Sequence, residues 1–122
     1  KRNQTRYVEI KEASEALRQT AVDCKIPIVA GAQLRRTDSK DRRPRLDGLR
    51  ESGDIEQDAS LVLGLYREAV DKREEAENGT EITDNTMEVH ILKNRTGKGY
   101  GKTDLEFDGT VYHIGKVKES GI

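Results

Sequence analysis

Residues 8–32 read VEIKEASEALRQTAVDCKIPIVAGA and contain the two patterns that decide the fold class. Across residues 8–24, apolar side chains recur at three- and four-residue spacing, which places them on one face of an α-helix. Pro27 helps to end this helix, and residues 26–32 form a short, almost entirely apolar run. Such a run suits a strand buried on both faces of a parallel sheet. A helix followed closely by a buried strand predicts a three-layer α/β domain.

Two further strands are expected in the second half of the chain. Residues 61–66 are apolar, and residues 87–92 alternate between apolar and polar side chains. The polar, acidic stretch 67–85 between them predicts a frayed helix or a mobile excursion from the sheet edge.

The C-terminal third predicts an antiparallel hairpin. Leu105 and Phe107 alternate before Asp108-Gly109, and residues 111–113 continue the alternation after it. Asp-Gly between two alternating runs is a strong signal for a β-hairpin. We therefore expect an antiparallel extension of the sheet, with Val111 and His113 in its second strand.

Size and composition predict one domain over residues 1–122 with a small core. The chain has 122 residues, of which 33% are hydrophobic and 37% are charged. A piece of a larger domain would show the same apolar deficit, because its other half would supply the second face of the core. The single cysteine excludes an internal disulfide, and no segment is apolar enough to span a membrane. No cluster of cysteines and histidines has the spacing of a metal site.

Charge is unevenly distributed although the net charge is only −1. Residues 35–45 contain six basic side chains and two acidic ones. A basic loop of this kind can bind nucleic acid or phosphate, but charge runs are more often solvated surface. Both interpretations stay open on charge alone.

Residues 97–103 read GKGYGKT and imitate a phosphate-binding P-loop. A P-loop needs four residues between its glycines and must open a helix, whereas Gly97 and Gly101 are separated by three and a strand-like run follows. We expect a glycine-rich connection between strands. The chain then has no phosphate cradle of its own.

Residues 47–58, DGLRESGDIEQD, are the most distinctive stretch. They predict a loop that feeds a helix N-terminus, where free backbone N–H groups can bind phosphate. A plain capping turn explains the same pattern. The residue types in this stretch fit both a phosphate-binding helix N-terminus and a plain capping turn.

This stretch closely resembles the signature segment of DnaB-type replicative helicases. Residues 26–34, IPIVAGAQL, resemble the family's strand that ends in glutamine, and residues 93–97, KNRTG, resemble its Lys-x-Arg element. The resemblance covers about residues 7–114. It implies a partial RecA-like (P-loop NTPase) three-layer sandwich that lacks the P-loop half and carries the antiparallel hairpin at its C-terminal end.

The resemblance also implies catalytic roles for three residues. Gln33 would lie near the γ-phosphate of ATP and couple nucleotide state to the DNA loop. Arg95 would be the arginine finger for the ATP of the neighbouring subunit, assisted by Lys93. A guanidinium suits this role because it stays charged and its fork matches phosphoryl oxygens. Solvent-exposed polar strand ends are the alternative for all three residues.

The implied DNA loop contains Arg50, Glu51 and Gly53, and it would hold single-stranded DNA by its backbone. The implied cofactor is ATP with Mg²⁺, both bound mainly by parts absent from this chain; no metal ligand is expected within it. The implied partners are identical subunits in a ring, as a homohexamer, together with a primase and a helicase loader. A cytoplasmic location without membrane contact is expected.

Two departures from the family pattern leave alternatives open. The P-loop, the catalytic glutamate and the Mg²⁺-holding aspartate are absent, and Ala32 stands where the family usually has a small hydroxyl residue. Another RecA-like ATPase, such as a recombinase or a clock-type ATPase, is one alternative. A non-catalytic module that binds single-stranded DNA or a ring is the other.

Overall fold

The structure is a computed structural model, and it describes the backbone of residues 2–35, 40–75 and 84–117. Side chains are described within these ranges except at residues 2–3, 50–53 and 73–75. The elements, in chain order, are α1 (Arg2–Cys24), the 3₁₀-helix η1 (Leu46–Ser52), α2 (Gly53–Asp58), β1 (Leu61–Tyr66), α3 (Glu68–Glu75), β2 (Thr86–Asn94), β3 (Gly101–Asp108) and β4 (His113–Val117).

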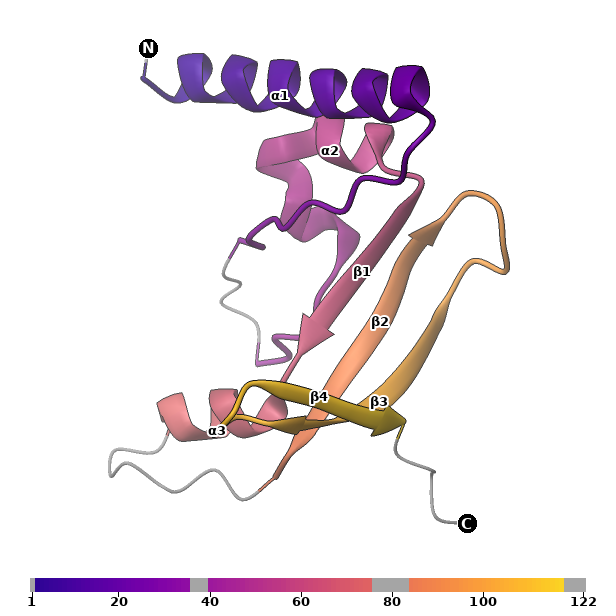
Figure 1. Cartoon of the computed structure of the whole chain (residues 1–122). Helices are drawn as coiled ribbons and strands as arrows, with labels where there is room; N and C mark the ends of the chain where they lie inside the picture. Colours follow the sequence, from indigo (N-terminus) through magenta and orange to yellow (C-terminus); the bar gives the residue numbers. More distant parts are fainter. Residues whose placement is uncertain (1, 36–39, 76–83, 118–122) are drawn as a thin grey trace.

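The four strands form one antiparallel sheet in the order β1-β2-β3-β4. Leu65 of β1 pairs with Val89 of β2, and Val89 pairs in turn with Thr103 of β3. Figure 1 shows α1 lying across α2 at one end of the molecule, while the sheet extends away from both helices. The α/β class is therefore confirmed, and every strand of the described residues is antiparallel.

The strands expected from apolar runs and alternation are confirmed at β1, β2 and β3. Residues 95–100 connect β2 to β3 and no helix follows them, so the rejection of a P-loop is also confirmed. The Asp108-Gly109 hairpin is confirmed, but its loop is longer than expected. Asp108 pairs with His113, which places Val111 in the turn and not in the strand. Tyr112 accommodates the longer turn with a φ of 52°.

The strand expected at residues 26–32 was wrong for the described chain. This segment has neither helix nor strand, and Val29 is 98% exposed. A parallel strand needs neighbouring strands that satisfy its N–H and C=O groups. None of the described strands pairs with this segment, so its apolar side chains remain at the surface.

The helix expected at residues 8–24 is confirmed as α1, but the described chain does not cover its apolar face. Val8, Leu17 and Cys24 on the apolar face are exposed. Ile10 and Ser14 are half-buried, and Ser14 contacts α2. Hydrophobic periodicity identifies the apolar stripe of a helix, but it does not say whether the described chain covers that stripe.

Few side chains are buried among the described residues. The buried hydrophobic ones are Leu49 of η1 and Met87 of β2. Pro44 is buried against β1, where Gly64 leaves room for it. The opposite face of β1 leaves its three alternating leucines, Leu61, Leu63 and Leu65, at least half exposed. The domain core is thus small, as the composition predicted.

Candidate functional site

Lys93 and Arg95 lie at the C-terminal end of β2, and both side chains reach the last turn of α2. The Lys93 ammonium donates to the carbonyls of Glu56 and Gln57. The Arg95 guanidinium donates through Nη2 to the Gln57 carbonyl at 2.7 Å. The last carbonyls of a helix have no partner within it, and cations there are favoured by the helix dipole. The two cations therefore cap the C-terminal end of α2.

The Arg95 side chain remains exposed in this arrangement. The described hydrogen bond occupies one of its terminal nitrogens, while a guanidinium carries five N–H donors in a planar fork. The residue is thus anchored at one nitrogen and still has donors for a planar, anionic partner.

Backbone contacts hold the same region together. The Arg95 N–H donates to the Ser60 carbonyl at 2.9 Å, and Leu61 pairs with Asn94 where β1 meets β2. The chain leaving α2 is therefore fixed to the strand end that carries both cations. This contact spans more than thirty residues of sequence, and it joins the stretch that contains α2 to the end of β2.

The expected DNA loop lies at the other end of α2. Arg50 and Glu51 belong to η1, and Gly53 begins α2. The side chains of Arg50 and Glu51 lie outside the described part of the structure, so only the backbone of this stretch is placed. Leu49 beside them is 6% exposed, which anchors η1 in the small core. The helix start predicted for this stretch is confirmed, because α2 begins at Gly53, but the 3₁₀-helix η1 and not a loop leads into it.

Gln33 is exposed and lies in the segment without regular structure, not at the tip of a strand as expected. Its neighbours nevertheless contact η1. The Arg35 N–H donates to the Gly48 carbonyl at 3.1 Å, and a Cβ at Gly48 would stand 3.3 Å from Cδ2 of Leu34. The structure therefore brings the Gln33 segment next to the candidate DNA loop, and it brings Lys93 and Arg95 to the far end of the following helix.

Two polar contacts fix α2 to α1. Ser14 Oγ donates to Asp58 Oδ2 at 2.7 Å. The Tyr7 hydroxyl is hydrogen-bonded to Asp54, and this bond together with the nearby negative charge raises the pKa of Tyr7.

An ion-pair network around the buried carboxylate of Glu88 on β2 was not predicted from the sequence. Glu88 is 7% exposed, and both its oxygens accept from Arg43, Oε2 from Nε and Oε1 from Nη2, each at 3.0 Å. His90 lies 2.7 Å from the same carboxylate, and Lys102 lies 3.5 Å from it. The Arg43 hydrogen bonds are the largest cause that lowers the Glu88 pKa to about 2. Arg43 also lies over the ring of Tyr66, 5.0 Å from its centre.

The chain resembles known proteins along nearly its whole length. Residues 1–116 match the family described as the DnaB-like helicase C terminal domain. The chain belongs to the DnaB-like helicase family. It is 43% identical over 105 residues to the replicative DNA helicase DnaB of Mycoplasma genitalium and 38% identical over 116 residues to that of Haemophilus influenzae. These alignments cover 84% and 93% of the chain, respectively.

Solved structures agree with this assignment. A solved ATPase domain superposes with a TM-score of 0.78 at 30% identity, over 93% of this chain and 38% of that one. A DnaB-like replicative helicase solved for its interactions with primase superposes with a TM-score of 0.77 at 31% identity, over 90% of this chain and 26% of that one. The RecA-like helicase ATPase fold is therefore confirmed. The chain spans 22–23% of the length of the two curated DnaB relatives.

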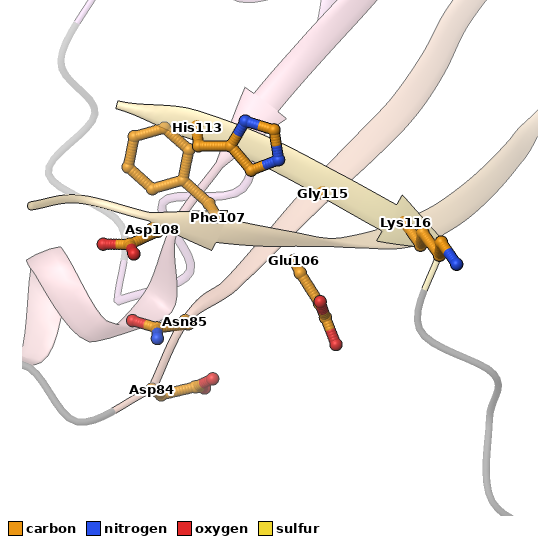
Figure 2. Close-up of a pocket in the computed structure, with 8 residues that line it drawn as sticks. All are labelled: Asp84, Asn85, Glu106, Phe107, Asp108, His113, Gly115 and Lys116. Atoms are coloured by element: carbon orange, nitrogen blue, oxygen red, sulfur yellow. The ribbon is translucent and has the colours of Figure 1, made fainter. Parts of the chain in front are cut away.

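The hollow in Figure 2 is separate from the candidate DnaB-like site. It lies near β3 and β4 and has a volume of about 730 Å³. None of the six residues expected to bind DNA or phosphate lines it; its lining residues are Asp84, Asn85, Glu106, Phe107, Asp108, His113, Gly115 and Lys116. Asp84 and Asp108 each accept hydrogen bonds from a nearby threonine, which gives their carboxylates a local structural role.

Within residues 2–35, 40–75 and 84–117, no group of three acidic, histidine or cysteine side chains is gathered to hold a metal ion. At the end of β2, Lys93 is half-buried and Arg95 is exposed, and ammonium and guanidinium groups are the side chains that bind phosphate oxygens. None of the described helices is long and apolar enough to cross a membrane.

Proposed function

We propose that this chain is part of an ATP-driven replicative helicase that unwinds duplex DNA by moving along single-stranded DNA. The observation that carries the proposal is the exposed Arg95 at the end of β2, in a chain of the DnaB-like family. Lys93 and Arg95 act on the ATP bound by the neighbouring subunit. Their charge stabilises the negative charge that spreads over the γ-phosphoryl oxygens in the transition state.

The active site is shared between subunits in this proposal. ATP and Mg²⁺ are held mainly by residues outside this chain, and ATP supplies the phosphoryl group that is transferred to water. Gln33 senses the γ-phosphate within its own subunit, and the contact between its segment and Gly48 supports a route to the DNA loop. This chain alone hydrolyses no ATP.

Arg50, Glu51 and Gly53 form the DNA-contacting loop of the proposed helicase. Its backbone is anchored by the buried Leu49 on one side and continues into α2 on the other. These two anchors suit a loop that must keep its conformation while DNA is pulled through the ring. Phosphate contacts dominate such binding, so affinity is tolerant of sequence and falls with salt.

The assembly that fits these roles is a homohexameric ring around single-stranded DNA. A primase and a helicase loader are further proposed partners; the primase is supported by the solved relative whose interactions with primase are known. The family assignment favours a helicase over a recombinase or a clock-type ATPase.

Arg95→Ala in the full-length protein tests the proposal. We expect ATP turnover to fall about 10³-fold or more while ATP binding is retained, because an arginine finger acts in the transition state. Turnover in the presence of single-stranded DNA and the dissociation constant of a fluorescent ATP analogue are measured side by side. DNA-stimulated turnover at the wild-type rate would remove Arg95 from this role.

A further inference from the structure

The two ends of α2 contact two different parts of the proposed machinery. The helix begins at Gly53, where the DNA-contacting loop ends, and its last carbonyls accept from Lys93 and Arg95. Six residues at a rise of 1.5 Å each make a helix about 9 Å long. Figure 1 shows this short helix between α1 and the start of β1. A displacement of one end of so short a helix also displaces the other end.

A helix of this length is not stable by itself, because isolated helices shorter than about twelve residues are marginal in water. Its position must come from tertiary contacts. On one side these are the bonds from Tyr7 and Ser14 of α1 to Asp54 and Asp58. On the other side they are the cations of β2, which satisfy carbonyls that the helix itself leaves unpaired.

We propose that Lys93 and Arg95 have a second role as positioning residues for the DNA-contacting loop of their own subunit. By capping the C-terminal end of α2, they tie that end of the helix to the end of β2 and thereby hold the backbone that enters the helix at Gly53. The inference rests on the proposed function for the identity of that loop. It assigns to the two cations an effect on DNA binding that does not require a nucleotide.

The test is single-stranded DNA binding by the full-length helicase without nucleotide. The probe is a fluorescein-labelled oligothymidylate at low salt. Without nucleotide the cations have no phosphoryl group to contact, so a purely catalytic role leaves DNA affinity unchanged. We expect Lys93→Ala to weaken binding about two- to fivefold, the range expected for losing a cation at a helix C-terminus. Lys93→Arg keeps a donor there and should restore binding to within twofold of the wild type.

Lys98→Ala is the matched control. Lys98 is an exposed lysine of the β2–β3 connection, and the contacts described for α2 do not include its ammonium. The control should bind DNA like the wild type. If Lys93→Ala and Lys98→Ala weaken DNA binding equally, the effect comes from the lost positive charge alone, and the proposal is overturned. Wild-type DNA affinity in Lys93→Ala would overturn it as well. Thermal unfolding and ring size are compared for all variants, so that a misfolded protein is recognised.

ATP turnover of Arg95→Ala separates the two ideas. Lost turnover with unchanged nucleotide-free DNA binding would keep the finger role and overturn the positioning role. Retained turnover with weakened DNA binding would overturn the finger role and keep the contact with α2.

Discussion

The guanidinium of Arg43 and the carboxylate of Glu88 form a two-nitrogen, two-oxygen pair in which both hydrogen bonds are 3.0 Å long. Arg43 belongs to the segment that precedes η1, and Glu88 belongs to the strand that ends near Arg95. The pair therefore joins the approach to the candidate DNA loop to the strand that ends one residue before the candidate finger. Planar, two-fold pairing of this kind is specific to arginine.

Replacing Glu88 by alanine should destabilise the ATPase domain. The change removes the buried carboxylate that accepts from Arg43, and hydrogen bonds to charged groups contribute about 2 kcal/mol. We expect the midpoint of thermal unfolding of the full-length protein to fall by several degrees. Glu106→Ala is the control, since Glu106 is an exposed carboxylate on the neighbouring strand β3. Equal midpoints for both variants would contradict a stabilising role for the network.

Acid should weaken the same network over a defined range. The pKa of Glu88 is about 2 in the folded state against an ordinary value of 4.5. The ionised form is therefore favoured by folding, and its contribution is complete above pH 4.5 and is lost as the pH falls towards 2. Between pH 5.5 and 3, the unfolding midpoint of Glu88→Gln should depend less on pH than that of the wild type. Parallel curves for the two proteins would show that Glu88 is not the group responsible.

Gly64 is required by the packing of Pro44 on β1. A Cβ at Gly64 would stand 2.5 Å from Cβ and Cγ of Pro44 and 3.0 Å from Cδ1 of Leu92. Gly64→Ala should therefore destabilise the domain by about 1–3 kcal/mol, the usual range for overpacking. Thermal unfolding measures the effect, and Gly99→Ala serves as control because nothing lies within 4 Å of its added Cβ. A Gly64→Ala protein as stable as the control would mean that the segment at Pro44 can move aside at no cost.

Arg50→Ala should lower affinity for single-stranded DNA and also its dependence on salt. Each phosphate contact on a single strand contributes about 0.7 to the slope of log affinity against log salt, so the slope should decrease by about that amount. The titration uses labelled oligothymidylate and the full-length protein. Lys116→Ala removes an exposed cation of β4 and should leave the slope unchanged. An unaltered slope for Arg50→Ala would count against the loop assignment.

Local patterns in the sequence predicted most of the elements, because helices and hairpins depend on nearby residues. The periodicity before Cys24, the apolar run at β1 and Asp108-Gly109 all correspond to observed elements. Residues 26–32 did not follow their pattern, because a parallel strand is defined by neighbours that the described chain does not supply. A buried-strand pattern indicates that a segment requires neighbouring strands, but it does not show whether those strands are present in the described chain.

The family resemblance named Lys93 and Arg95 as a pair, and in the structure both side chains donate to the carbonyl of Gln57. Their roles in catalysis stay a prediction. Their capping of α2 and the pair between Arg43 and Glu88 were not predicted. Both join residues about forty positions apart, and nothing in local spacing indicates which acid a given arginine meets. An isolated acid within an alternating strand, as at Glu88, is the signal that could have prompted the search.

Mixed rings test most directly whether Arg95 acts on the neighbouring subunit. Full-length Arg95→Ala subunits are combined with subunits whose P-loop lysine is replaced, so that each parent ring is inactive. If the finger acts in trans, some interfaces of a mixed ring combine the intact P-loop of an Arg95→Ala subunit with the intact Arg95 of a P-loop variant. The mixture should then recover a substantial fraction of wild-type ATP turnover. A mixture as inactive as both parent rings, after subunit exchange has been verified, would contradict the account.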